Sequence, residues 1–357
     1  MASTLKGLIL SGGHGTRLRP LTYTSAKQLI PIANKPVLFY GIEALREAGI
    51  TEIGIVVGHT RDEIEAAVGD GSRFGVRVTY IAQDAPRGLA HAVMIAEDFI
   101  GDSPFVMYLG DNFIIDGVTP IVEKFNARQS EAMILLARVA NPQQFGVAVL
   151  EGEIIRELVE KPKVPPSDLG IIGVYVFTKS IFTACKSIKP SWRGELEITD
   201  AIQKLITDGR DVRAEIVTGY WKDTGRPEDL LDANRMVLDR VAHQIEGDVD
   251  AESRVEFRVK IERGAIVRRS VIRGPVMVAA GAVIEDAYIG PFTSVGENCV
   301  VRSSEVEHSI LLANSRVLSL QGRVVDSVLG RGASVERGDE RPRAMRFVLG
   351  DNSQVKA

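Results

Sequence analysis

Aliphatic residues recur at every sixth position through the last third of the chain, and this period restricts the fold more than any other feature of the sequence. The series slips by one residue in two places. Its members are Ile266, Ile272, Val278, Ile284, Ile289, Val295, Val301, Val306, Leu312, Leu318 and Val324. A six-residue period is typical of a parallel β-helix, in which each coil of three short strands stacks on the next coil. Because one coil cannot bury its own apolar face, we expect several stacked coils.

Short apolar runs alternate with amphipathic stretches near the start of the chain. The runs that we expect to form strands are 7–10, 52–57, 76–81 and 105–109, and the helical stretches are 37–48, 60–69 and 89–99. This alternation predicts an α/β fold with a Rossmann-like, mostly parallel sheet and helices on both faces. In such sheets, ligands bind at the carboxyl ends of the strands.

These two patterns divide the chain into an α/β domain and a β-helix. An amphipathic helix over 227–241 closes the first domain in this interpretation, and an acidic stretch follows it. The expected parts are an α/β domain over 1–245, a linker over 246–252, the β-helix over 253–330 and a polar tail over 331–357.

Composition excludes several classes of protein. The chain of 357 residues has a net charge of −4, whereas nucleic-acid-binding proteins favour a basic surface, so we expect no nucleic-acid partner. No apolar run approaches the roughly 20 residues of a membrane span. No charged-then-apolar leader opens the sequence either, so we expect a cytoplasmic protein without a membrane partner. The cysteines Cys185 and Cys299 lack metal-type spacing and suit a reducing compartment.

A glycine-rich turn, Ser11-Gly12-Gly13-His14-Gly15, follows the first apolar run, and two cations, Arg17 and Lys27, come after it. Glycines lack Cβ, so backbone N–H groups there can approach the phosphates of a ligand. The turn contains no P-loop sequence, and Leu18 stands where a dinucleotide fingerprint needs a third small residue. A glycine cluster alone is equally compatible with a tight turn, but the strand, the glycines and the cations together favour an anion site.

Two acidic turns come after apolar stretches that lie far apart in the chain. Asp111 follows the run at 105–109, and Asp223 lies in the segment Trp221–Gly225. Mg²⁺ usually takes one or two protein carboxylates and completes its shell with water and substrate phosphates. The two aspartates therefore suit a magnesium site, although either carboxylate alone would also suit a turn.

The order Gly-Gly-x-Gly-Thr-Arg-Leu-x-Pro-Leu-Thr with its downstream lysine resembles the sugar-nucleotidyltransferase family, and the resemblance covers about residues 5–240. Within that family it is most similar to the long-form enzymes that join glucose 1-phosphate to dTTP. The resemblance implies a glycosyltransferase-A-like domain followed by a left-handed β-helix. It leaves UTP open as the nucleotide, because uracil and thymine differ by one methyl group.

The resemblance also implies roles for individual residues. Arg17, Lys27 and Lys161 would be catalytic cations, and Asp111 and Asp223 would bind Mg²⁺. The nucleotide-binding residues would be Leu10, Ser11, Gly12, Gly13, Gly15, Thr16, Gln28, Gln83, Gly88 and Leu89. The sugar-binding residues would be Asn112, Gly146, Glu160, Val174 and Tyr175.

Several alternatives stay open. Arg193 is a weaker candidate for phosphate binding, and we favour a helix-capping role for Thr199. The β-helix could carry an acyltransferase activity with His308 as its base and His243 nearby, which would make the chain bifunctional. We favour self-association or regulation by the β-helix, and we expect a homo-oligomer because most soluble oligomers are symmetric assemblies of one chain.

Overall fold

The structure is a computed structural model, and it describes residues 5–338. Internal contacts divide the chain into two compact units. The first unit comprises the chain up to residue 15 together with 25–30 and 36–224, and the second comprises 16–24, 31–35 and the chain from 225 onward. The second unit therefore takes in two short segments from the start of the chain, and each unit is described below by itself.

A nine-stranded sheet forms the centre of the first unit, in the order β5-β4-β1-β6-β11-β8-β12-β10-β9. Strands β5, β4, β1 and β6 are parallel, as the alternating pattern predicts, and β11 and β8 continue the sheet antiparallel to their neighbours. The bounds are β1 (Lys6–Ser11), β4 (Glu52–Val57), β5 (Arg77–Ala82), β6 (Phe105–Leu109), β8 (Ala132–Arg138), β9 (Gly146–Glu151), β10 (Ile154–Glu160), β11 (Leu169–Phe177) and β12 (Val212–Ile216).

The strand order reverses at β1. Strands β4 and β5 lie on one side of it, and β6 lies on the other. Loops that leave the carboxyl ends of β1 and β6 therefore diverge and open a crevice at this edge, where open α/β sheets bind their ligands. The glycine turn follows β1 and Asp111 follows β6, so this reversal brings both motifs to one place.

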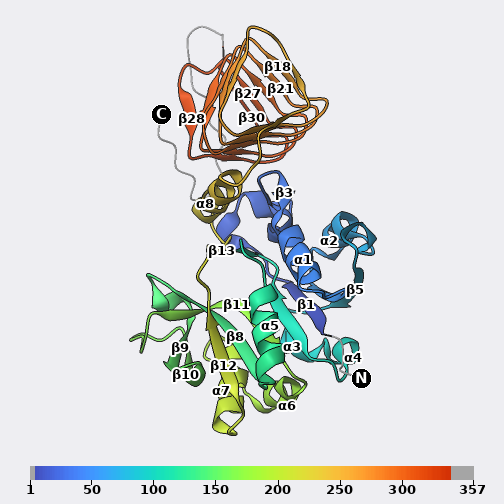
Figure 1. The fold of residues 1–357 in the computed structure, drawn as a ribbon, viewed down its shortest axis with the longest axis vertical. Coiled ribbons are helices and arrows are strands. Elements are labelled where there is room, and N and C mark those ends of the chain that lie inside the picture. Colours follow the sequence, from blue (N-terminus) through green and yellow to red (C-terminus); the bar gives the residue numbers. More distant parts are fainter. Residues whose placement is uncertain (1–4, 339–357) are drawn as a thin grey trace. The chain divides into compact units, whose positions relative to one another are not determined.

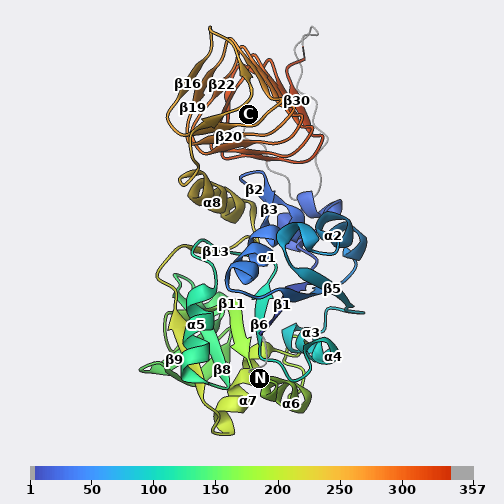
Figure 2. The same cartoon turned by 45° about the vertical axis from the view of Figure 1, so that its right-hand side comes forward.

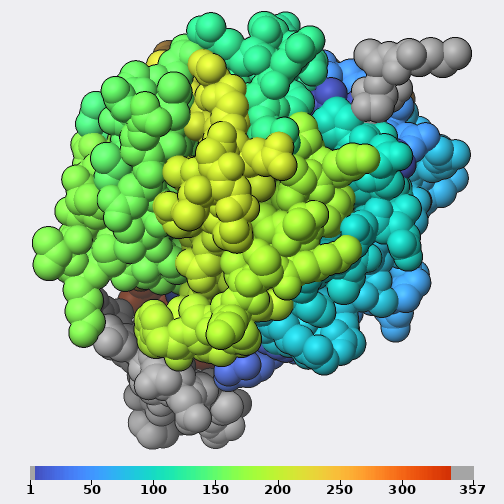
Figure 3. Space-filling view, turned by 90° about the horizontal axis from the view of Figure 1, so that it is seen from below, coloured from blue at the N-terminus to red at the C-terminus, as the bar shows by residue number. Residues whose placement is uncertain are grey.

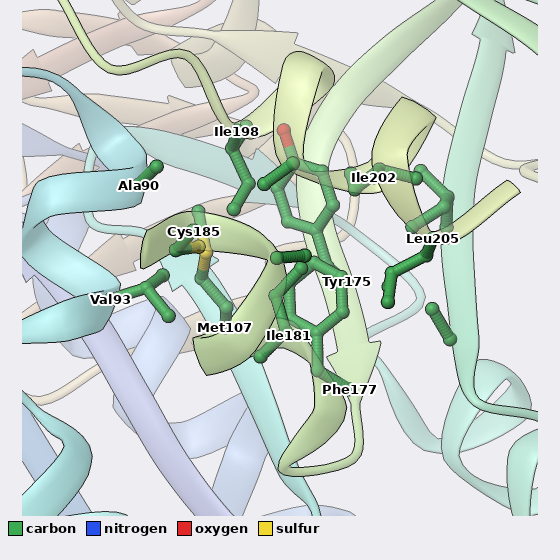
Figure 4. Packing of buried hydrophobic residues seen from close by; sticks show 14 of the residues in the cluster. Ala90, Val93, Met107, Tyr175, Phe177, Ile181, Cys185, Ile198, Ile202 and Leu205 are labelled. Carbon is green, nitrogen blue, oxygen red and sulfur yellow. The ribbon is translucent and has the colours of Figure 1, made fainter. Parts of the chain in front are cut away.

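Helices cover both faces of the sheet (Figures 1 and 2). Buried residues of α1, α2 and α5 pack on one face, and those of α3, α6 and α7 pack on the other. Figure 4 shows the second layer, where Val93 of α3, Cys185 of α6 and Ile202 of α7 point toward Met107 and Tyr175 of the sheet. The bounds are α1 (Val37–Glu47), α2 (Arg61–Val68), α3 (Leu89–Met94), α4 (Glu97–Ile100), α5 (Thr119–Arg128), α6 (Ser180–Ser187) and α7 (Ile198–Thr207).

One expected helix, over 89–99, is interrupted. The Ala96 N–H donates to the carbonyl of Val93 at 3.0 Å, which is the tighter three-residue spacing, and the chain restarts as α4. Figure 3 shows the far end of this unit, where α6 and α7 lie side by side between the green strands β9 and β10 and the cyan segment of α3 and α4.

Short elements complete the first unit. Strands β7 (Asn112–Ile114) and β13 (Trp221–Asp223) pair antiparallel. The 3-10 helices of this unit are η3 (Lys27–Leu29), η4 (Ser72–Phe74) and η5 (Pro142–Gln144).

The second unit is a left-handed β-helix preceded by helix α8 (Pro227–Leu238), and its strands stack in parallel on three faces (Figure 1). One face holds β14 (Gln244–Ile245), β17 (Val259–Ile261), β20 (Val276–Val278), β23 (Thr293–Val295), β26 (Ile310–Leu311) and β29 (Val328–Leu329). The second holds β15 (Asp248–Val249), β18 (Ile266–Arg268), β21 (Val283–Glu285), β24 (Val300–Arg302), β27 (Arg316–Leu318) and β30 (Ser334–Glu336). The third holds β16 (Arg254–Glu256), β19 (Val271–Arg273), β22 (Tyr288–Ile289), β25 (Glu305–Glu307) and β28 (Arg323–Val325).

Successive coils are in register at a spacing of 17 residues, as in the pairing of Ile261 with Val278. Three exact hexads would need 18 residues, so one side of each coil is a residue shorter, and this accounts for the slips in the six-residue series. The phase of the series was wrong at two positions. Val267 and Val317 are fully buried, whereas the predicted Ile266 is 37% exposed and Leu318 is half-buried.

The stretch 246–252 is not a plain linker. It contains β15, which pairs with β18, and β14 just before it pairs with β17. Val249 packs against the β-helix core while Asp248 on the same strand is exposed, so the acidic residues occupy the outside of the first coil. Of the expected tail, β30 belongs to the last coil, and residues 339–357 lie outside the described part.

The second unit also includes η1 (Thr16–Leu18), η2 (Leu21–Tyr23) and the turn of a hairpin formed by β2 (Pro31–Ile32) and β3 (Lys35–Pro36). Among the described residues, no helix is both long enough and apolar enough to span a membrane.

Candidate active site

The loop after β1 lies against the residues predicted to surround a nucleotide. A Cβ on Gly12 would lie 2.7 Å from Oε1 of Gln83, and a Cβ on Gly13 would lie 3.2 Å from Nζ of Lys27. Only glycine allows the first of these approaches without a shift. Ser11 ends β1 fully buried, and its Oγ has no hydrogen-bond partner within the described protein. The loop therefore brings a spare hydroxyl and a cation to the edge of the sheet.

Lys27 belongs to η3, and its ammonium forms an ion pair and hydrogen bond with Oδ2 of Asp111. Both side chains are largely shielded from solvent, which strengthens their attraction compared with a surface pair. The ammonium also lies beside Gly13. The predicted catalytic cation and one predicted metal ligand are thus in contact at the phosphate loop.

Asp111 and Asp223 lie on adjacent segments of backbone. Asp223 pairs with Asn112 across the β13–β7 ribbon, and Thr224 donates to the carbonyl oxygen of Asp111 from its N–H at 3.1 Å and from its hydroxyl at 2.7 Å. Two carboxylates from segments over a hundred positions apart are therefore held at one site.

This donor set fits a hard cation. It consists of carboxylate oxygens, and the described residues contain no group of three or more His, Cys, Asp or Glu side chains that could enclose a metal by themselves. Mg²⁺ keeps several waters and often binds through one or two carboxylates plus phosphates, so two aspartates beside a phosphate loop are a suitable partial shell.

The predicted base contacts lie on both sides of this site. Gln28 is 1% exposed, and its Oε1 has no protein partner in the described chain. Its Cγ lies 3.4 Å from the position of a Cβ on Gly110. Gln83 shares a hydrogen bond of 3.1 Å with Nδ1 of His91. A buried amide oxygen without a partner is costly unless a ligand or water satisfies it, which supports a ligand at Gln28.

The loop before α3 is fixed by backbone contacts. Gly88 has a φ of 105°, and a Cβ there would lie 2.4 Å from the carbonyl oxygen of Leu196. The N–H of Leu196 donates to Arg87 at 2.8 Å, and that of Ala90 donates back to Leu196 at 3.0 Å. Leu89 is the first residue of α3. The nucleotide loop is therefore joined directly to the segment that carries the predicted sugar contacts.

Glu160 is the centre of the predicted sugar half. Its carboxylate accepts from the Thr199 hydroxyl at 2.9 Å and lies 3.5 Å from Nζ of Lys161 and 3.6 Å from Nη1 of Arg193. A Cβ on Gly146 would lie 3.2 Å from the same carboxylate. The structure thus gathers Glu160, Lys161, Gly146 and the weaker candidate Arg193.

The capping role favoured for Thr199 is wrong. Helix α7 begins at Ile198 with Glu197 at its N-cap, and no side chain makes the cap hydrogen bond. Thr199 is already inside the helix, so its hydroxyl is directed to Glu160 instead.

Glu197 is a residue that the sequence analysis missed. It is only 4% exposed, and its carboxylate accepts from the Ser191 hydroxyl at 2.9 Å and from Nη1 of Arg193 at 3.3 Å. Burial raises the pKa of Glu197, and burial followed by the charge of Glu160 raises the pKa of Asp200. The alternating acids in Glu195-Leu-Glu-Ile-Thr-Asp were the available signal.

The remaining predicted sugar contacts are buried. The amide of Asn112 donates to Ile172 at 2.6 Å and accepts from the Trp221 indole at 3.3 Å, so it joins three strands. Val174 and Tyr175 face opposite sides of β11, and burial followed by the charge of Glu160 raises the pKa of Tyr175. Their contact with a sugar stays a prediction.

Thr16 and Arg17 lie in η1 of the second unit, next to Gly15, which has a φ of 61°. Leu10, with Ser11, ends β1 in the first unit. The roles of Arg17 and Thr16 at the triphosphate stay predictions.

A family described as nucleotidyl transferase matches residues 6–240 of the chain. The chain belongs to this family. Nucleotidyltransferases of this family generally use a divalent metal, and a nucleoside triphosphate with a sugar phosphate suits the site described above. The family resemblance seen in the glycine loop is therefore confirmed.

Relatives extend the match beyond this domain. The chain is 52% identical to a glucose-1-phosphate thymidylyltransferase of Streptomyces griseus over 99% of both chains. It is 49% identical to the low-salt glycan biosynthesis nucleotidyltransferase Agl11 of Haloferax volcanii, over 99% of this chain and all of that one. It is 37% identical to the bifunctional protein GlmU of Methanocaldococcus jannaschii, over 92% of this chain and 78% of that one.

Among solved structures, a UDP-glucose pyrophosphorylase complexed with UDP-glucose superposes with a TM-score of 0.60 at 27% identity. This match covers 66% of the present chain and all of the solved one. The nucleotidyltransferase fold is thus shared with an enzyme solved with a nucleotide sugar.

Proposed function

We propose that this chain transfers a thymidylyl group from dTTP to α-D-glucose 1-phosphate and releases pyrophosphate. The observation that carries this proposal is the meeting of Lys27, Asp111 and the Asp223 strand at the glycine loop. The relative from Streptomyces griseus, which is 52% identical along nearly the whole chain, supports the choice of substrates.

In the proposed reaction, a phosphate oxygen of glucose 1-phosphate attacks the α-phosphorus of dTTP. A new P–O bond forms, and the bond to the departing pyrophosphate breaks in line with it. Lys27 would contact the α-phosphate and the leaving side, and the Ser11–Gly15 backbone with Arg17 would hold the other phosphates. Lys161 would hold the sugar phosphate. The chain's contribution is orientation and charge neutralisation, and no covalent enzyme intermediate is needed.

Mg²⁺ is the metal we propose for Asp111 and Asp223. When bound, it would offset the negative charge that develops on the phosphate oxygens. Lys27 is paired with Asp111 in the structure, so the incoming phosphates and the metal would share this carboxylate and ammonium between them.

The choice of nucleotide and sugar is the finest part of the proposal. Gln28 and Gln83 would read the base, with the spare Oε1 of Gln28 available for a donor on it. A pocket distinguishes one methyl group by roughly 1–3 kcal/mol, so UTP is the competing substrate. Pyrophosphate release measured over four nucleotides and several sugar 1-phosphates tests this choice. A kcat/KM highest for UTP, or for another sugar phosphate, would contradict the pairing proposed here.

A second candidate is acyl transfer on the β-helix. Nδ1 of His308 lies 2.5 Å from Oδ1 of Asp326, which is the orientation a carboxylate gives to a general base. The other candidate, His243, accepts the Val259 N–H at 3.3 Å and is held by the backbone. Incubation with acetyl-CoA and an amino-sugar phosphate tests this candidate, and an absence of acetylated product would remove it. Homo-oligomer formation and a cytoplasmic location stay predictions.

A further inference from the structure

The second unit encloses both sides of the segment that carries Lys27. Residues 16–24 and 31–35 belong to that unit, and the six residues between them, 25–30, belong to the first unit. Arg17 lies in the first of these flanking segments. The covalent chain therefore connects the Lys27 segment at both of its ends to elements that pack with the β-helix.

One buried amide joins three elements of the second unit. Asn234 on α8 is fully buried, and its Oδ1 accepts from the Ala33 N–H at 2.8 Å and from the Ser294 hydroxyl at 2.6 Å. Its Nδ2 donates to the carbonyl of Phe292 at 3.0 Å. Every polar atom of this side chain is satisfied, so the β2–β3 turn, α8 and the coil at β23 are held in one arrangement.

The flanking segments make two further contacts with the coils. Nδ2 of Asn34 donates to the carbonyl of Val295 at 3.0 Å. Leu21 in η2 approaches the coil at Gly330, where a Cβ would lie 3.5 Å from its side chain. The turn residues Ala33 and Asn34 have φ values of 46° and 60°, which both central residues of a tight two-residue hairpin require.

We propose that the β-helix serves as the scaffold that positions Lys27 and Arg17, and that Asn34 and Asn234 are positioning residues for nucleotidyl transfer. This rests on the function proposed above. A short segment with both ends fixed has few conformations, so its lysine is ordered before the nucleotide arrives. Releasing one end would leave the chemistry intact but would spread Lys27 over many positions.

The test compares three variants. Asn34→Gly keeps the positive φ of the turn and removes only the amide bond to Val295, whereas Asn234→Ala removes the whole cluster. Asn314→Gly is the matched control, because Asn314 has a φ of 62° on an exposed corner of the β-helix. We expect kcat to fall about tenfold in Asn34→Gly and Asn234→Ala. We expect KM for the nucleotide to change by less than about threefold, because Lys27 acts mainly in the transition state.

Melting temperature and amide hydrogen exchange separate positioning from a loss of stability. We expect Asn34→Gly to melt like Asn314→Gly while the amides of 16–30 exchange faster and those of the β-helix do not. A kcat and an exchange pattern equal to those of Asn314→Gly would overturn the proposal. If the wild type transferred no nucleotide to any sugar phosphate, the proposed function would fail instead, and faster exchange in 16–30 would still show that the two asparagines hold this segment.

Discussion

At the scale of single residues, the pair formed by Lys27 and Asp111 decides whether the site works as proposed. Lys27→Ala removes the cation beside Gly13, and Asp111→Asn removes one carboxylate from the metal site. We expect each change to lower kcat by roughly 10²–10³-fold, the usual loss when a group that stabilises transition-state charge is removed. Pyrophosphate release measures the effect, with the exposed Lys189→Ala as a control. A rate near that of the wild type in either variant would exclude the assigned role.

The buried carboxylate of Glu197 predicts a pH dependence of stability. Burial raises its pKa in the folded protein, so the folded state holds this proton more tightly than the unfolded state does. The stabilisation is complete below the ordinary glutamate pKa of about 4.3 and is lost as pH rises through the raised value. We expect Glu197→Gln, which does not ionise, to gain melting temperature relative to the wild type over this rise.

The control for this pH experiment is Glu195→Gln, because Glu195 also binds Arg193, at 3.1 Å. Asp200 is present in all three proteins, so its own raised pKa cancels from the comparison. A melting difference between Glu197→Gln and the wild type that stays constant with pH would contradict the assigned burial effect.

At the scale of elements, the connection from β5 to α3 predicts an intolerant glycine. Gly88→Ala would combine a strained φ of 105° with a Cβ 2.4 Å from the Leu196 carbonyl, whereas Gly101→Ala has a φ of 62° and open space. We expect Gly101→Ala to lose about 1–3 kcal/mol of unfolding free energy to backbone strain and Gly88→Ala to lose clearly more, because overpacking adds about 1–3 kcal/mol. Urea denaturation measures both. Equal losses would mean that the loop moves away from Leu196 without cost.

Local patterns explain which elements were predictable. The strand at 52–57 matched its observed bounds because an apolar run reports its own burial, and Asp111 lay at the strand end as expected. The inward phase at Val267 was missed because it depends on how a coil closes around 17 residues, which the spacing of isoleucines alone does not contain.

Long-range packing explains what the sequence could not supply. The stretch at 246–252 looked like a linker because its charged residues were read without the coil that they cover. Glu197 was missed because its partners, Ser191 and Arg193, meet it only after the turn before α7 has folded. The inclusion of 16–24 and 31–35 in the second unit likewise depends on contacts with residues some two hundred positions away.

At the scale of the whole molecule, the fold and the metal are separable. Three apolar clusters stabilise the two units, and the described residues hold no cluster of ligands that could enclose a metal without substrate. We therefore expect a chelator to abolish nucleotidyl transfer and to leave the melting temperature of the ligand-free protein unchanged. Added Mg²⁺ should restore the activity, since the aspartates remain in place.

Nucleotide binding provides the last part of this prediction. A ligand that binds only the folded state raises stability by RT ln(1 + [L]/Kd), which is about 2.7 kcal/mol at a hundredfold excess over Kd. If Asp111 and Asp223 bind the metal together with the triphosphate, dTTP should raise the melting temperature strongly with Mg²⁺ and weakly without it. Asp223→Asn should lose most of this difference while its ligand-free melting stays that of the wild type. A chelator that lowered the ligand-free melting temperature would instead reveal a metal that the fold itself needs.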